Sequence, residues 1–166
     1  MSDLTGTNYR AEGREHGYNA QLLVGDGVVG SSPQTYEAVA EVVRIRPGGL
    51  TTATFNATHL RSPNAHQELR AAMRSSEPWE IECNYRPLHE SQSQAGGGSG
   101  SFQTGGLLAL NIARTEKDFV IRLASGFEFP IQAFISAYTP GEIGPDDGMA
   151  LTIQLTPLRD YSGNLP

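Results

Sequence analysis

Apolar residues alternate with polar ones along the segment Phe127–Ala137, and this period of two continues through six alternations. Successive side chains of a β-strand point to opposite faces, so the segment is predicted to be a strand with one buried face. Pro130 falls inside the run and has no backbone N–H to donate, which predicts an edge position or a β-bulge there. A chain with this segment must build its core on a β-sheet.

The same alternation recurs in two other segments. In the range 79–85, one face carries Trp79, Ile81, Cys83 and Tyr85, and the other carries Glu80, Glu82 and Asn84. In the range 149–155, the alternating apolar residues are Met149, Leu151, Ile153 and Leu155. Further strand-like runs occupy the ranges 36–46, 50–58, 107–113 and 118–124. The turn sequence Pro47-Gly48-Gly49 predicts a hairpin between the first two of these runs.

One segment has helical spacing instead. Ser62 is a suitable N-cap, and Pro63 suits the first helical position. Downstream, one helical face carries Ala65, Leu69, Ala72 and Met73. We therefore expect one short flanking α-helix at about residues 63–75. Because the chain lacks the repeated crossover helices of a parallel sheet, the predicted fold is mainly β: an antiparallel β-sandwich or barrel with this single helix.

The domain organisation follows from length and local composition. A chain of 166 residues suits a single domain. We expect a flexible N-terminal arm at 1–20, a β-domain at 21–158 and a C-terminal tail at 159–166. Within the domain, the Gly/Ser-rich segment 91–106 is predicted to be a mobile loop, because it offers little apolar surface to bury. No apolar run is long enough to cross a bilayer, so no membrane association is expected.

A glycine pattern raises the question of nucleotide binding. Gly25, Gly27 and Gly30 form a G-x-G-x-x-G sequence. In dinucleotide-binding proteins the last glycine opens a helix whose N-terminal amides face the pyrophosphate. Here Pro33 follows, and the next element is strand-like, so the pattern is interpreted as a turn-rich loop.

No other constellation indicates catalysis, a metal or a cofactor, and none is expected. Cys83 is the only cysteine and lies on the apolar strand face, where a thiol behaves as a small hydrophobe. Glu80 and Glu82 have the spacing of a solvated strand face rather than of a buried acid pair. The net charge of −6 argues against a surface that grips nucleic acid. We therefore expect a protein that is not an enzyme.

Several segments occur in a characteristic order. They are LLVGDG, SSPQTYEAVAEVVRI, PGGLTTATFNATHLRSP, HQELRAAM, WEIECNYRP, SGFEFPIQAFISAYTP and GMALTIQLTPLRDYSG. This order, with the A-E-V residues from Ala40 to Val42 and the T-H-x-x-S-P motif from Thr58 to Pro63, resembles the major tail tube proteins of long, non-contractile-tailed bacteriophages. The resemblance covers residues 22–163.

The resemblance implies a β-sandwich subunit of a virion tail, with self-association as its main partnership. Six copies would form a ring, and rings would stack into a hollow tube that other tail proteins close at its ends. DNA would pass through the lumen without specific binding. The candidates for acidic residues of the lumen or surface, all expected on strands, are Glu41, Glu80, Glu82 and Glu128.

Two alternatives stay open. The same subunit could belong to a gene transfer agent or a tail-like bacteriocin, and the sequence does not separate these particles from a phage. The chain could instead be a β-sandwich module that recognises carbohydrate or protein on a virion or cell surface. Such a module would favour exposed aromatic residues at loop tips, and Phe102 is the only one in the long loop.

Overall fold

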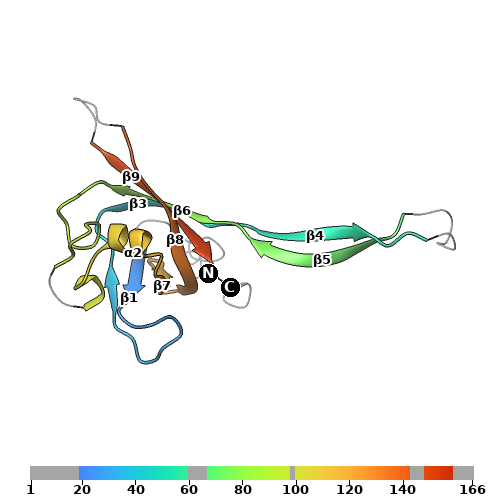
Figure 1. The fold of residues 1–166 in the computed structure, drawn as a ribbon, viewed down its shortest axis with the longest axis horizontal. Helices are drawn as coiled ribbons and strands as arrows, with labels where there is room; N and C mark the ends of the chain where they lie inside the picture. Colours follow the sequence, from blue (N-terminus) through green and yellow to red (C-terminus); the bar gives the residue numbers. More distant parts are fainter. Residues whose placement is uncertain (1–18, 60–66, 98–99, 143–147, 159–166) are drawn as a thin grey trace, which may run out of the picture.

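The structure is a computed structural model that describes residues 19–59, 67–97, 100–142 and 148–158 (Figure 1). Residues 1–18 of the expected arm 1–20, the expected tail 159–166 and the start of the expected helix, residues 63–66, lie outside these ranges. The described strands are β1 (Gln21–Gly25), β2 (Tyr36–Ala38), β3 (Val42–Arg46), β4 (Leu50–Asn56), β5 (Leu69–Ser76), β6 (Trp79–Asn84), β7 (Glu116–Arg122), β8 (Glu128–Pro140) and β9 (Ala150–Pro157). Two helical elements accompany them: the 3₁₀ helix η3 (Gly100–Phe102) and the α-helix α2 (Leu107–Ala113).

The predicted fold class, mainly β with antiparallel sheets and one short α-helix, is confirmed. Seven strands form one antiparallel sheet in the order β2-β1-β7-β8-β9-β6-β3, and β4 and β5 form a separate two-stranded sheet. The two edge strands of the large sheet, β2 and β3, are joined by residues 39–41 alone. Because four residue steps span at most about 14 Å, the sheet must curl until its two edges approach each other. The body is thus an open barrel.

The core fills the inside of this curled sheet. The predicted alternation is confirmed in β6, β8 and β9, whose buried residues are Trp79, Ile81, Cys83, Ile131, Ala133, Ile135, Leu151, Ile153 and Leu155. Pro130 pairs with Val120 of β7, and the register of β8 with β9 begins only at Ala133. The proline therefore lies in the first part of β8, before the part that pairs with β7 on one edge and with β9 on the other. This agrees with the expected edge position.

The position predicted for the helix is wrong. Residues 69–76 form strand β5, which pairs antiparallel with β4 from the pair Leu50–Ser76 to the pair Asn56–Leu69. Leu, Arg, Ala and Met are good helix formers, but helix propensity is a weak preference that long-range pairing overrides. Here the segment pairs with the Thr-rich strand β4 along its length, with one register shift between Thr52 and Thr54.

The α-helix lies instead at α2, in the segment 107–113 that was interpreted as a strand. Its buried residues Leu107 and Leu110 are three positions apart and share one face, which packs on β8 (Figure 1). The side-chain amide of Asn111 donates a hydrogen bond to the carbonyl oxygen of Ile135 at 3.0 Å. That carbonyl lies at the register shift of β8, where a bulge frees backbone groups from the ladder.

The hairpin predicted across Pro47-Gly48-Gly49 does not form. Strand β3 pairs with β6, whereas β4 turns away to pair with β5. Residues 47–49 therefore mark the point where the chain leaves the body. A Cβ atom on Gly48 would lie 2.0 Å from the carbonyl oxygen of Glu77, so the two backbones meet here at a distance that only glycine permits.

We expect Gly48→Ala to lower the free energy of unfolding by about 1–3 kcal/mol, because backbone must move to admit the methyl group. The matched control is Gly148→Ala, since a Cβ atom there meets no atom within 4 Å. Chemical denaturation of both variants measures the difference. Equal stability of the two variants would show that the base of β4 and β5 adapts freely.

The segment 91–106 was expected to bury little surface, and this is wrong. Its buried residues include Ser91, Gln92, Ser101 and Phe102, and Gly105 and Gly106 are buried as well. The backbone N–H of Leu107 donates to the carbonyl oxygen of Ser91 at 2.8 Å and closes the segment into a compact loop. The hydroxyl of Ser101 donates to the carbonyl oxygen of Val24 at 2.6 Å, which ties the loop to β1. The mobility of the segment stays a prediction.

Candidate assembly surfaces

Strands β4 and β5 form a two-stranded ribbon that extends away from the body; we call it the extended hairpin (Figure 1). Every residue of the ribbon except Leu50 and Ser76, the pair at its base, is exposed. An isolated two-stranded ribbon is marginally stable in water at best, because it has no second layer on which to bury a face. The extended hairpin thus lacks, within the described chain, the packing that would hold it rigid.

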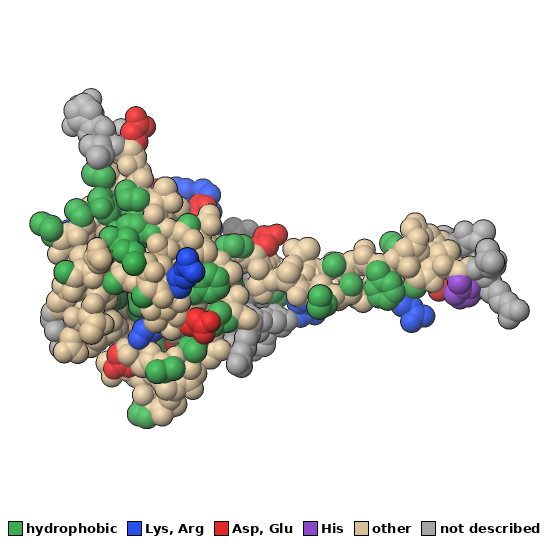
Figure 2. Space-filling model, viewed as in Figure 1, with side chains coloured by type: hydrophobic (Ala, Val, Ile, Leu, Met, Phe, Trp, Pro, Cys, Tyr) green, Lys and Arg blue, Asp and Glu red, His purple; other side chains and the backbone are tan. Residues whose placement is uncertain are grey.

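Apolar side chains lie along this ribbon. Phe55, Leu69 and Met73 are 51%, 60% and 86% exposed. In Figure 2 hydrophobic side chains are spread along the hairpin, with basic side chains beside them. These exposed side chains are apolar surface that is available for contact with another chain. Among the described residues, the outer edges of both β4 and β5 are unpaired, and such edges are templates for pairing with another chain.

A second surface lies where the two edges of the curled sheet approach each other. Among the described residues, strand β3 pairs only with β6, so its other edge is open. An open pocket of about 1080 Å³ lies beside this edge, and we call it the seam groove. Its lining includes Val39, Val43, Ile45, Trp79, Ile121 and Phe129. Asn19, Gln21, Glu41 and Arg44 also line it, so the groove is mainly apolar and is bordered by strand backbone that is unpaired among the described residues.

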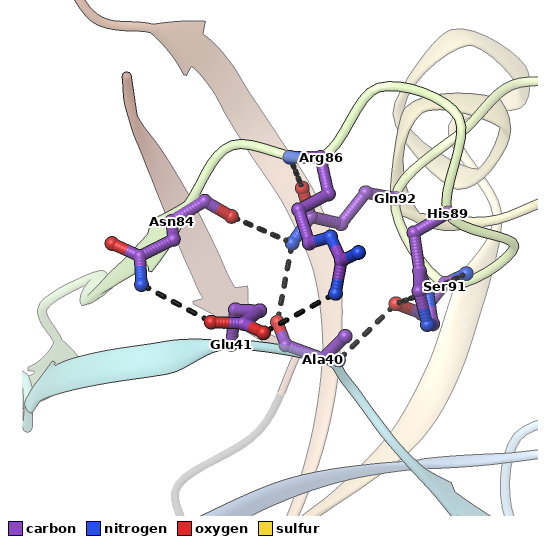
Figure 3. A network of polar contacts seen from close by, with 7 residues as sticks. All are labelled: Ala40, Glu41, Asn84, Arg86, His89, Ser91 and Gln92. Carbon is purple, nitrogen blue, oxygen red and sulfur yellow. Dashed lines mark hydrogen bonds and ion pairs between the residues drawn. The ribbon is translucent and has the colours of Figure 1, made fainter. Parts of the chain in front are cut away.

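A polar network fixes the turn that leads into β3 (Figure 3). Gln92 is completely buried. Its side-chain amide donates to the carbonyl oxygens of Ala40 at 3.1 Å and Asn84 at 3.0 Å. Its side-chain oxygen accepts the backbone N–H of Arg86 at 2.7 Å. One side chain thus joins the β2–β3 turn to the end of β6.

Tyr138 of β8 also belongs to this network, through the backbone of Gln92. Its hydroxyl donates to the backbone carbonyl oxygen of Gln92 at 3.2 Å. Burial, followed by the electrostatic effect of Tyr85, raises the pKa of Tyr138 to about 12. The phenol stays protonated at physiological pH and remains a hydrogen-bond donor to Gln92.

Glu41, a candidate lumen residue, lies in this turn and not on a strand. It adopts a left-handed backbone conformation with φ of 59°. Its carboxylate accepts hydrogen bonds from the side chains of Asn84 at 3.2 Å and Arg86 at 3.3 Å. The expected strand position is wrong, because a left-handed residue with these contacts ends β2 and redirects the chain into β3.

The other three acidic candidates do lie on strands, and each has an arginine beside it. Across β3 and β6, Glu82 meets Arg44 at 3.6 Å and Glu80 meets Arg46 at 2.9 Å. Across β7 and β8, Glu128 meets Arg122 at 2.7 Å. With the pair of Glu41 and Arg86, all four candidates are therefore charge-compensated. The structure does not bring them together as one acidic patch.

The glycine pattern lies in the loop from β1 to β2. As expected, a strand and not a helix follows it, because β2 begins at Tyr36. The backbone N–H of Gly30 donates to the carboxylate of Asp118 at 2.8 Å, and the side-chain amide of Gln34 bonds the same oxygen. The amide that would face a phosphate in a nucleotide site is thus occupied by a carboxylate of β7.

Cys83 is fully buried on β6, as predicted. Burial, followed by the neighbouring charge of Glu82, raises the pKa of its thiol to about 12. The nucleophilic thiolate is therefore scarce at neutral pH. In the described ranges, no group of three or more His, Cys, Asp or Glu residues is placed to hold a metal ion. Nor does the described chain contain a helix of the length and apolarity that a bilayer crossing requires.

Solved structures share this fold. A chain from the tail of an empty GTA particle with C6 symmetry is 14% identical, with 84% of this chain and 92% of that chain covered and a TM-score of 0.56. A chain from the six-fold symmetrised baseplate of the anti-feeding prophage (AFP) is 11% identical, with 84% and 89% covered and a TM-score of 0.50. No protein-family model and no curated protein matches the sequence. The chain thus has the fold of subunits found in six-fold symmetric tail and baseplate structures.

Two structural features had no complete signal in the sequence. The extended hairpin was divided between a predicted hairpin and a predicted helix, although the turn at Pro47-Gly48-Gly49 did mark its base. The seam groove had no sequence signal, because its lining comes from strands whose order in the sheet cannot be obtained from their alternation.

Proposed function

We propose that this chain is the structural subunit of a phage-like tail, which assembles into six-membered rings stacked as a hollow tube. The fold it shares with chains of a C6-symmetric tail and a six-fold baseplate supports this assignment. The extended hairpin is the observation that carries it. A ribbon of this length with exposed Phe55, Leu69 and Met73 has no purpose in an isolated subunit, and it supplies an arm that contacts the next copy.

The open edge of β2 supplies the complementary feature, since among the described residues β2 pairs only with β1. A sheet whose edges are unpaired in one subunit can continue into the sheet of its neighbour, and closure of the ring removes all such edges. A head-to-tail contact of this kind produces a closed ring or a filament, depending on its rotation. The ring interface and the stacking interface therefore use different surfaces of the same chain.

The experiment that tests this function is light scattering and negative-stain microscopy of the purified chain over a range of concentrations. We expect rings and short tubes that grow with concentration. Monomers at all concentrations would contradict self-assembly. The alternative of a binding module for carbohydrate or protein would instead give a monomer that retains a specific glycan or peptide.

We further propose that the outer face of β3 and β6 lines the lumen. Arg44 pairs with Glu82, and Arg46 pairs with Glu80, so the two acids and two bases cancel on this face. Thr152 and Gln154 of β9 continue the same rows across the sheet. A neutral polar wall offers DNA neither clustered cations to bind nor a strongly repulsive field.

The double variant Glu80→Gln/Glu82→Gln tests the lumen assignment. It removes both acids and leaves Arg44 and Arg46 without these partners. Because the pairs are partly exposed, we expect the stability to change by less than about 1 kcal/mol for each pair. Tubes of the variant should retain double-stranded DNA at low salt and release it as salt rises, whereas wild-type tubes should not.

The control is Glu116→Gln/Glu142→Gln, which changes the net charge equally at two exposed acids elsewhere. The measurement is co-sedimentation of labelled DNA with preformed tubes at several salt concentrations. If both double variants retain DNA to the same extent, the effect comes from net charge alone and the lumen assignment is wrong.

A further inference from the structure

The seam groove leaves a large apolar surface and a strand edge uncovered in the described chain. Its volume is about 1080 Å³, and Trp79, Ile121 and Phe129 are among the residues that line it. Val43 of β3 borders it and is 58% exposed, which is high for a β-branched residue of a sheet. Half of the backbone groups of β3 point away from β6 into this space. These features describe a site that accepts one extended segment.

The described part of the chain begins in the wall of this groove. Asn19, Ala20 and Gln21, the first described residues, are part of the groove lining. Asn19 has a left-handed backbone with φ of 59°, which turns the chain immediately before β1. Eighteen residues precede it in the sequence. The segment 1–18 is thus attached to the wall of the groove.

We propose that residues 1–18 dock in the seam groove of their own subunit, as an extended strand on the open edge of β3. The five residues of β3 need about 17 Å of partner strand, and eighteen residues reach up to about 60 Å, so the length is ample. This segment contains Leu4, Tyr9 and Tyr18, and mainly polar residues separate these three larger side chains. The proposal does not depend on the proposed function.

The attachment point favours this occupant over a second copy. A tether of this length gives a local concentration of the order of millimolar, far above that of another subunit in solution. The charged groups at the rim are already compensated, since Glu41 pairs with Arg86 and Arg44 with Glu82. Apolar contact and strand pairing therefore determine the docking, and the docked segment covers an edge that would otherwise invite aggregation.

Disulfide trapping in the full chain tests the docking and the identity of the occupant. Val43→Cys is combined in turn with Leu4→Cys, Tyr9→Cys and Glu12→Cys. The native Cys83 does not interfere, because it is fully buried and the pKa of its thiol is raised to about 12. Under mild oxidation we expect at least one pair to form an intramolecular disulfide, seen as a faster monomer band and confirmed by peptide mapping.

The control replaces Val43→Cys by Leu88→Cys, which is 96% exposed and does not line the groove. The Leu88 series should give no comparable intramolecular bond. Disulfide-linked dimers in the Val43 series would overturn the proposal, because a second copy would then occupy the groove. The absence of any bond in all three Val43 pairs would overturn it as well.

Hydrogen exchange gives an independent readout. Deletion of residues 2–18 should raise the amide exchange rate in Val42–Arg46 at least tenfold and leave the central strand β9 unchanged. Deletion of residues 159–166 is the matched control and should leave β3 protected. Unchanged exchange of β3 in the first deletion would contradict the proposal, whatever the state of assembly.

Discussion

The substitution Gln92→Leu is expected to lower the free energy of unfolding by about 3–6 kcal/mol. Leucine has a similar size but no polar atoms, so it leaves the carbonyl oxygens of Ala40 and Asn84 and the N–H of Arg86 without their partner. Each of these three backbone groups that loses its hydrogen bond is expected to cost about 1–2 kcal/mol, within the range for an unsatisfied buried polar group. Chemical denaturation followed by circular dichroism measures the loss.

The control for this prediction is Gln103→Leu, which makes the same change at an exposed position of the same loop. It should alter the stability by less than about 0.5 kcal/mol. The Gln92 variant should also show faster amide exchange in the turn 39–41, because that turn loses its connection to β6. A loss below 1 kcal/mol would mean that water replaces the side chain and that the network is dispensable.

The triple substitution of Phe55, Leu69 and Met73 by serine is expected to abolish tube formation. If each side chain contributes about 1–2 kcal/mol at the contact with the next copy, their removal weakens that contact by about 3–6 kcal/mol. This corresponds to a rise of roughly 10²–10⁴-fold in the concentration required for assembly. The body should fold normally, since the core contains none of these residues.

The matched control places the same three changes on the body, at Val28, Leu88 and Ile112, which are 76%, 96% and 57% exposed. This variant should assemble as the wild type does. Microscopy and sedimentation of both triple variants distinguish a specific contact from a general loss of surface hydrophobicity. Assembly of the hairpin variant at wild-type concentrations would remove the extended hairpin from the proposed interface.

The sequence was sufficient to predict those strands whose local pattern agrees with their tertiary environment. Strand β6 alternates between the core and the polar face, and the prediction from Trp79 to Tyr85 matches its burial. Strand β9 behaves in the same way. A strand in a sheet with one covered face carries this pattern in its own residues, so no knowledge of its neighbours is required.

The predictions for β5 and α2 failed for opposite reasons. In β5 the residues favour a helix, but pairing with β4 determines the structure, and that pairing depends on residues far along the chain. In α2 the Leu-rich sequence resembles a buried strand, because short apolar runs of strand and helix look alike. The spacing of Leu107 and Leu110 was the available signal.

The polar features were harder to predict than the apolar ones. Gln92 lies in a Ser/Gln/Gly-rich stretch that predicts an exposed loop. It is buried instead, and its side chain bonds backbone groups of Ala40, Asn84 and Arg86. The pairing of Glu80 and Glu82 with arginines likewise depends on β3 lying beside β6. Both features follow from strand order, which alternation does not specify.

Electron cryo-microscopy of the assembled wild-type chain tests the central claim most directly. We predict a hollow six-fold tube in which the extended hairpin of each subunit contacts a neighbouring copy and the free edge of β3 is covered. A homogeneous population of isolated subunits at high concentration, with the hairpin extending into solvent, would contradict this account.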